Sequence, residues 1–174
     1  MSDRQRLFFA LWPDTSLHEL LPPLGELQKE CGGRVYPLTN LHVTLNFVGG
    51  VNEPTRRCLE QAVSGIVIPS FKLVLDQYGY WPRPRVMWLG CSETPAPLHD
   101  LVYALGAAVK QCGIEQEKRP YQPHMTLLRK ARQAPSESPP VIQWAVDNFV
   151  LAESVSTLHG VEYRVLRRWH LEGR

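Results

Sequence analysis

The segment NLHVTLNFVG, residues 40–49, contains a His-x-Thr-Leu motif that the chain repeats as HMTL at residues 124–127. With 6 His, 7 Thr and 23 Leu in 174 residues, about 0.03 occurrences are expected by chance, although short motifs ordinarily carry a high false-positive risk. Two copies are therefore poorly explained by coincidence. A helical pattern precedes each copy, and this order predicts an α+β chain, 1–174, with an internal pseudo-duplication.

Each motif reads as a β-strand with one polar face. Residues i and i+2 of a strand point to the same side, so His42 lies beside Thr44, and His124 lies beside Thr126. The residues between and after them are expected to bury the opposite side, Val43, Leu45 and Phe47 in the first motif and Met125 and Leu127 in the second. If the two halves face each other, the two His–Thr pairs converge in one cleft.

Proline and glycine divide the rest of the chain into short elements. Helices are expected over 14–32, with a break at Pro22–Pro23, over 54–66 and over 95–113. Strands are expected over 6–12, 35–36, 41–48, 71–75, 86–90, 124–128, 142–154 and 161–169. Most strand-to-strand joints are too short for crossovers, which predicts largely antiparallel sheets.

Composition indicates an ordinary globular protein. Hydrophobic residues make up 44% and charged residues 21%, and the net charge is +2. The longest nearly apolar stretch, Leu101–Val109, falls far short of the ~20 residues that span a bilayer. The N-terminus carries no signal-peptide pattern, so we expect a cytoplasmic protein without a membrane segment.

Cysteine usage and charge distribution add two expectations. The four cysteines, Cys31, Cys58, Cys91 and Cys112, show no CxxC pair and are expected to be reduced. Basic residues gather from position 83 onward, and they include Arg83, Arg85, Lys118, Arg119, Arg129, Lys130, Arg132, Arg164, Arg167 and Arg168. This charge fits either a solvated face or a surface that contacts a few phosphates.

The paired histidines suggest phosphodiester hydrolysis. One imidazole can take the proton of an attacking water while the other protonates the leaving oxygen. The threonine hydroxyls can donate to the non-bridging phosphate oxygens, where charge accumulates in the transition state. The carboxylates nearest the motifs, Glu53, Glu115 and Glu117, lack metal-ligand spacing, so no metal or other cofactor is expected.

Several flanking blocks extend the pattern over residues 4–170. RLFFALWP at 6–13, NLHVTLNFVG at 40–49, RPRVMWLG at 83–90, RPYQPHMTLLR at 119–129 and YRVLRRW at 163–169 resemble the bacterial RNA 2′,3′-cyclic phosphodiesterases. This LigT-like 2′-5′ RNA ligase family belongs to the two-histidine phosphoesterases. The resemblance implies two pseudo-symmetric lobes, each an antiparallel sheet with outer helices, around a central cleft.

The resemblance also implies an activity and roles for particular residues. The reaction is hydrolysis of RNA 2′,3′-cyclic phosphate ends to 2′-phosphomonoesters, with reversible, ATP-independent 2′-5′ joining of tRNA halves as a second activity. His42 matches the proton donor and His124 the proton acceptor. Thr44 and Thr126 match phosphate-binding threonines, and Arg129 matches the arginine of the second motif. We expect a monomer that needs no cofactor.

The strand pattern and the composition also predict where several other side chains lie. Strict alternation turns Arg129 away from Thr126, unless a bulge or a strand end intervenes. Asn46 shares the face of His42 and is expected to reach substrate. Six aromatic residues are candidates for the mouth of the cleft, where they would stack on bases: Phe9, Tyr36, Tyr80, Trp81, Trp88 and Tyr121.

Two other functions fit the same residues. One is a cyclic phosphodiesterase for a small nucleotide, such as ADP-ribose cyclic phosphate. The other is a non-catalytic module that binds phosphorylated RNA ends. Turnover of an oligonucleotide compared with a mononucleotide separates the first alternative, and binding without release of a phosphomonoester identifies the second.

Overall fold

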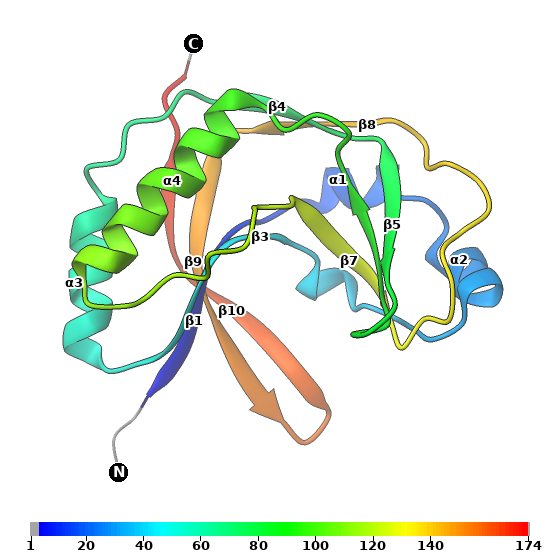
Figure 1. Ribbon diagram of the computed structural model, residues 1–174, viewed down its shortest axis with the longest axis horizontal. Coiled ribbons are helices and arrows are strands. Elements are labelled where there is room, and N and C mark those ends of the chain that lie inside the picture. The colour runs from blue at the N-terminus through cyan, green and yellow to red at the C-terminus, as the bar shows by residue number, and fades with distance from the viewer. Residues whose placement is uncertain (1–3, 174) are drawn as a thin grey trace.

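A computed structural model describes residues 4–173 (Figure 1). One lobe contains the strands β1 (Gln5–Leu11), β3 (Val43–Val51), β9 (Asn148–Thr157) and β10 (Gly160–His170). The other lobe contains β2 (Arg34–Val35), β5 (Gln77–Trp81), β6 (Val86–Gly90) and β7 (His124–Arg129). A small separate sheet pairs β4 (Phe71–Leu75) with β8 (Ile142–Val146). The helices are α1 (Thr15–Leu20), α2 (Leu24–Cys31), α3 (Glu53–Val63) and α4 (Ala96–Gln111), with a 3₁₀ turn, η1, at Leu38–Asn40.

The two lobes share one sheet of order β10-β9-β1-β3-β7-β6-β5, in which β2 also pairs with β7. All of its strand pairs are antiparallel. Between the lobes, β3 and β7 pair only through Val43 and Met125. The expected α+β class with antiparallel sheets is confirmed, and the strands of the two His-x-Thr motifs meet at the junction of the lobes.

The helices lie on the outside of the two lobes (Figure 1). Pro22 and Pro23 separate α1 from α2, as expected, because an interior proline lacks the amide proton that a helix needs. Helices α3 and α4 pack on each other, and α4 packs on β3. Asp14 caps α1 through its side chain, and Asn52 caps α3 in the same way.

Strand β1 is buried on both faces for most of its length. Leu7, Phe9 and Leu11 point into the main core that runs through both lobes. Phe8 and Ala10 point the other way and pack on Val150 and Ala152 in a second, smaller cluster. The face of β1 that carries Phe8 therefore forms the apolar support beneath the first motif.

Two strand predictions need correction. The stretch expected as one strand over 142–154 is two strands, β8 and β9, which belong to different sheets and are separated at Asp147. Strand β5 was not predicted, because Gly79 in its centre weakens the strand pattern. A Cβ at Gly79 would lie 2.0 Å from the Trp88 ring, so only glycine leaves room for this indole.

A disulfide joins Cys58 of α3 to Cys112 at the end of α4, which corrects the expectation that all four cysteines are reduced. The two residues are 54 positions apart in sequence, and only the packing of α3 on α4 brings them together. Cys31 and Cys91 are free and buried.

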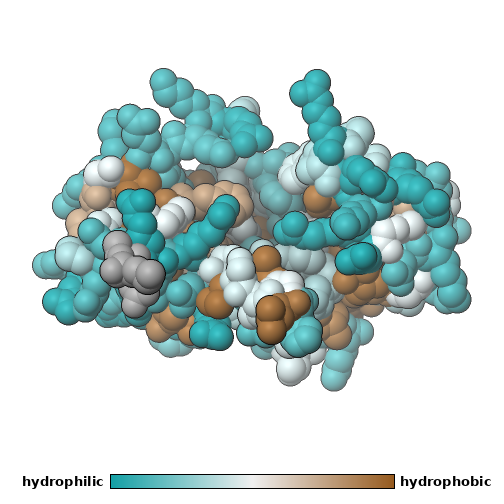
Figure 2. Space-filling model, turned by 90° about the horizontal axis from the view of Figure 1, so that it is seen from below, coloured by the Kyte–Doolittle hydropathy of each residue, from teal (hydrophilic) through white to brown (hydrophobic). Residues whose placement is uncertain are grey.

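The surface seen from below the view of Figure 1 is mainly hydrophilic, with separate hydrophobic spots (Figure 2). Exposed apolar side chains of the first lobe include Phe47, Val161 and Val165. Within residues 4–173, no helix combines the length and the apolar character needed to cross a membrane.

Candidate functional site

His42 directly precedes β3, and its ring is fixed by two hydrogen bonds. Its Nδ1 lies 2.6 Å from the carbonyl oxygen of Asn40, and its Nε2 lies 3.0 Å from Oγ1 of Thr44. A carbonyl only accepts, so the neutral ring carries its proton on Nδ1. Nε2 then accepts from the Thr44 hydroxyl, and this is the nitrogen that faces the rest of the site.

His124, the first residue of β7, is held by the same kind of contact. Its Nδ1 lies 2.8 Å from the carbonyl oxygen of Gln122, again two residues before the histidine. The neutral ring therefore also carries its proton on Nδ1, which leaves Nε2 with a free lone pair. Both motifs thus present the same nitrogen, in the same protonation state, as the reactive atom.

Aromatic side chains surround both imidazoles. Trp12 stacks on His42 at a centroid distance of 5.2 Å, and the rings of Phe8 and Tyr163 are each 5.0 Å away. His124 contacts Trp81 edge-to-face at 4.5 Å and lies 6.0 Å from Trp88. These apolar rings replace water around the histidines and disfavour the charged forms.

The pKa values follow from this environment. The pKa of His42 is lowered to about 4, mainly by burial; the bond to the Asn40 carbonyl opposes this shift, and repulsion from His124 and Arg129 adds to it. Burial also lowers the pKa of His124, against the bond to the Gln122 carbonyl. Both histidines are therefore neutral near pH 7 in the free protein.

The junction of the lobes brings the motifs together. Val43 pairs with Met125, and each is the residue after its histidine. Tyr121, in the segment that leads to His124, donates its hydroxyl to the Thr44 carbonyl at 2.9 Å. Thr126 lies opposite Trp88 in the second lobe and is partly buried. The predicted convergence of the two His–Thr pairs is therefore supported by the geometry.

Arg129 reaches the same face as Thr126 because β7 contains a bulge. Trp88 pairs with Thr126, but Met87 pairs with Leu128, so Leu127 is the extra residue in β7. Strict alternation placed Arg129 on the wrong face, and the bulge is the physical reason. Its guanidinium lies 5.0 Å from the Tyr36 ring centre, and its charge reaches His42.

A bulge in β3 overturns the placement of Asn46 and Phe47. Ala10 pairs with Thr44 and Phe9 with Asn46, so Leu45 is the extra residue. Asn46 therefore points toward α4 and binds Gln116 at 2.8 Å instead of facing substrate. Phe47 pairs with Phe8 and joins the face of Thr44, where it is 67% exposed.

Two of the six aromatic candidates lie beside a histidine. Trp81 and Trp88 flank His124 as expected, whereas Phe9 lies in the core against Phe149 and Trp169. Tyr80 packs against the core, and Tyr36 and Tyr121 act through their hydroxyls. The rings around His42 were missed: Phe8, Trp12 and Tyr163. Phe8 and Trp12 fall within residues 6–13, and Tyr163 falls within residues 163–169. Both blocks resemble the family, and this resemblance was the signal that could have identified the three rings.

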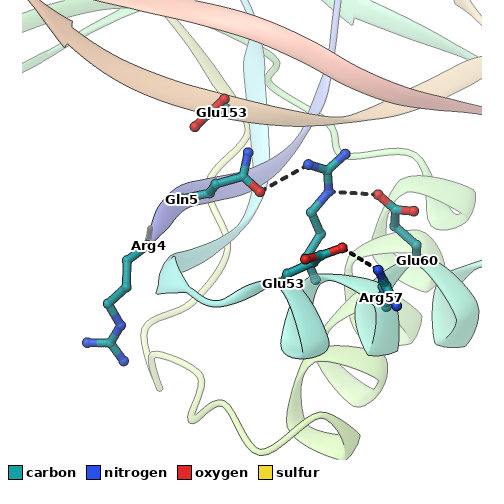
Figure 3. Close-up of a pocket in the computed structure, with 7 residues that line it drawn as sticks. Arg4, Gln5, Glu53, Arg57, Glu60 and Glu153 are labelled. Atoms are coloured by element: carbon teal, nitrogen blue, oxygen red, sulfur yellow. Dashed lines mark hydrogen bonds and ion pairs between the residues drawn. The ribbon is translucent and has the colours of Figure 1, made fainter. Parts of the chain in front are cut away.

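A polar pocket of about 610 Å³ lies elsewhere, between the start of β1 and α3 (Figure 3). Arg56 crosses it to bind Gln5 and Glu60, each at 3.0 Å, and Arg57 pairs with Glu53. None of the candidate site residues lines this pocket. Within residues 4–173, no cluster of three or more His, Cys, Asp or Glu side chains is arranged to hold a metal ion.

Comparison with known proteins identifies the family. The model of the 2′-5′ RNA ligase superfamily matches residues 13–165. The chain belongs to this superfamily. An Escherichia coli (strain K12) relative, named RNA 2′,3′-cyclic phosphodiesterase, is 36% identical over 98% of this chain and 99% of its own length. A relative of the same name from Archaeoglobus fulgidus is 30% identical over 93% of this chain and 98% of its own.

Solved structures of the superfamily agree with the fold. E. coli LigT in apo form superposes with a TM-score of 0.87 at 34% identity, covering 98% of this chain and 99% of that one. LigT complexed with 3′-AMP gives 0.86 at 34% identity, over 97% and 99%. A Thermus thermophilus protein, TT0787, gives 0.76 at 28% identity, over 97% and 98%. The overall fold of this chain is thus shared with these three structures.

Proposed function

We propose that the protein hydrolyses RNA 2′,3′-cyclic phosphodiester ends to 2′-phosphomonoesters, with His42 and His124 as the acid–base pair. The observation that carries this proposal is the matched geometry of the two motifs: each Nδ1 is held by a carbonyl, each Nε2 is left for chemistry, and the strands meet at Val43 and Met125. Full-length relatives named RNA 2′,3′-cyclic phosphodiesterase support the activity.

The reaction is an in-line displacement at phosphorus. Nε2 of His124 takes a proton from water as the water oxygen bonds to phosphorus. The bond between phosphorus and O3′ breaks, and Nε2 of His42 gives its proton to O3′, which leaves the phosphate on O2′. Thr44, Thr126 and Arg129 donate to the non-bridging oxygens as their charge grows.

His42 must first acquire a proton, because the free imidazole is neutral. The cyclic phosphodiester carries a negative charge, and an anion next to an imidazole favours its protonated form. Binding of substrate therefore raises the low pKa of His42 and creates the acid. The neutral His124 is already a base, which agrees with its lowered pKa.

Basic side chains favour an RNA strand over a small nucleotide. One end of the second lobe carries six exposed cations, and none of them forms an ion pair within residues 4–173: Arg34, Arg83, Arg85, Arg129, Lys130 and Arg132. Arg34 and Val86 both pair with Arg129, so this end adjoins the site. Upstream phosphates of an RNA can neutralise these cations.

Length dependence tests the substrate class. An oligonucleotide ending in 2′,3′-cyclic phosphate should give a higher kcat/KM than the mononucleotide, and only the oligonucleotide value should fall when Arg34→Glu and Arg83→Glu are combined or when salt is raised. Equal values for both substrates would favour the small cyclic nucleotide, such as ADP-ribose cyclic phosphate.

Hydrolysis with EDTA present is the decisive assay for the activity. The expected product carries its phosphate on O2′, and the rate is unchanged by chelation because acid, base and oxyanion donors are all side chains of this protein. Rates lost in EDTA and restored by zinc or magnesium would contradict the mechanism. Tight binding of phosphorylated ends without any phosphomonoester would identify a non-catalytic binding module.

Further properties follow as part of the same proposal. The chain is a single two-lobed domain, 1–174, that arose by internal duplication, and it acts as a cytoplasmic monomer without a cofactor. The pairing of β3 with β7 through the residues after the two histidines fits a duplicated unit. Reversible 2′-5′ joining of tRNA halves uses the same groups in the same roles, with a 5′-hydroxyl attacking phosphorus in place of water while O3′ again leaves, and incubation of 2′,3′-cyclic and 5′-hydroxyl RNA ends without ATP tests it.

A further inference from the structure

Asn40 occupies an unusual position beside the first motif. It ends the 3₁₀ turn η1, and it is the only buried side chain within residues 4–173 that is polar and not aromatic. Its Nδ2 donates to the carbonyl oxygen of Val161 in β10 at 2.9 Å. A buried amide is retained only where it is hydrogen-bonded, so this contact fixes the turn to a strand 121 positions away.

The backbone of the same residue holds the imidazole. The carbonyl oxygen of Asn40 is the acceptor for Nδ1 of His42 at 2.6 Å. The position of this oxygen is set by the backbone of 38–41, whose only regular structure is a single turn. The side chain of Asn40 thus anchors the atom that selects the tautomer of His42.

The second motif achieves the same geometry without such an anchor. Gln122 supplies the carbonyl for His124, but its side chain is exposed. The residue between them is Pro123, whose ring fixes φ near about −65°. The corresponding residue of the first motif is Leu41, which has a φ of −66° without a ring to impose it. An external contact therefore has to supply the constraint that proline supplies in the second motif.

Strand β10 is well placed to supply this constraint. Tyr163, two residues after Val161, accepts a hydrogen bond of 2.7 Å from the Tyr36 hydroxyl. Residues 36–40, which lead to His42, therefore have a second attachment to β10. The ring of Tyr163 also lies 5.0 Å from the His42 ring. Strand β10 therefore contacts the imidazole and, through Asn40, the backbone that orients it.

We propose that Asn40 is a positioning residue for His42, whose side chain ties the turn at 38–40 to β10 and so keeps the proton of the neutral imidazole on Nδ1 and Nε2 toward Thr44. This role rests on the proposed function for its effect on turnover. The tautomer of His42 is independent of any activity.

Two variants and one control test the role. Asn40→Ala removes the amide, and Asn40→Asp keeps the shape but removes the donor. Ring ¹⁵N NMR above about pH 8, where the imidazoles are neutral, reports the tautomer of His42. In both variants His42 should gain a population with the proton on Nε2. The kcat should fall by about 10–100-fold, which is the typical loss when a hydrogen-bond partner of a metal-binding histidine is mutated.

The pH profile separates positioning from loss of structure. The bond to the Asn40 carbonyl favours the charged imidazole, so weakening it in Asn40→Ala lowers the pKa of His42. In Asn40→Asp the added carboxylate acts in the opposite direction and raises it. The alkaline limb of kcat should therefore move down in one variant and up in the other, a divergence that a merely loosened fold does not produce.

Gln133→Ala is the matched control, because it removes an amide that donates to the Glu30 carbonyl at 3.0 Å, away from both motifs. It should leave the tautomer and kcat unchanged. An unchanged tautomer in Asn40→Asp would overturn the role, even if Asn40→Ala fails to fold. A wild-type protein with ordered His42 but no hydrolysis would refute the proposed function and leave the positioning role intact.

Discussion

The two His-x-Thr motifs have the same local geometry but different surroundings. In both, a carbonyl two residues before the histidine holds Nδ1. His42, however, is enclosed by three aromatic rings and bonded to Thr44, whereas His124 borders two tryptophans and has no such bond to its threonine. The carbonyl that precedes each motif therefore sets the tautomer, and the surroundings set how readily each imidazole takes a proton.

Removing either histidine should have the largest effect. His42→Ala and His124→Ala should each lower kcat by at least about 10²–10⁴-fold, because each loses one proton transfer. The double variant should lose less than the product of the two, because the residues act as a unit. Steady-state hydrolysis of a cyclic-phosphate oligonucleotide measures all three.

A substrate with a good leaving group separates the two roles. Its leaving oxygen needs no proton, so it should restore much of the rate of His42→Ala and little of that of His124→Ala. Restoration of the other variant would reverse the roles, and restoration of neither would contradict the acid–base assignment.

The threonines should come next in size. Thr44→Val and Thr126→Val each remove one donor to the phosphate, and losing one such donor costs roughly 10²–10³ in kcat. Only Thr44 is bonded to its histidine, so only Thr44→Val should also shift the pH profile. Thermal melting provides the control: early unfolding of either variant would mean that the hydroxyl is structural.

The pH dependence should reveal the difference between the histidines. In the free protein the pKa of His42 is about 4, and burial also lowers the pKa of His124, so the productive form, with His42 protonated and His124 neutral, declines about tenfold per pH unit above both values. The kcat/KM therefore falls as pH rises toward neutrality. In the complex the phosphodiester raises this pKa, so the alkaline limb of kcat should lie at higher pH. If the alkaline limbs of kcat/KM and kcat fell at the same pH, substrate binding would not raise the pKa of His42, and the proposal that substrate protonates this residue would be wrong.

The disulfide should affect stability and leave chemistry almost unchanged. Closing a loop of 54 residues stabilises the fold by about 4 kcal/mol in the chain-entropy model. The double variant Cys58→Ser with Cys112→Ser should unfold at lower denaturant while kcat changes less than about threefold. A large loss of kcat in folded protein would show that α3 and α4 control the site.

Sequence patterns predicted what depends on local chemistry. The i, i+2 rule placed each histidine beside its threonine, and Pro22–Pro23 marked a true helix break. The bulges at Leu45 and Leu127 were not predictable, because an extra residue in a strand leaves no mark on composition. They reversed the sides of Arg129, Asn46 and Phe47. Other misses are long-range, because Tyr163 and Cys112 reach their partners only through the fold.

The single residue pair between β3 and β7 also bears on how the molecule moves. The backbones of β3 and β7 are joined by one pair, Val43 with Met125, while side chains of both lobes share the core around it. His42 and His124 adjoin that junction, so they sit next to the pivot, where any rotation gives the smallest displacement. A side chain farther along β3, such as Phe47, has a longer lever arm and would be displaced more by the same rotation. A rotation of one lobe about this pair would therefore change the spacing of the two imidazoles less than it would change the spacing of the outer surfaces of the lobes.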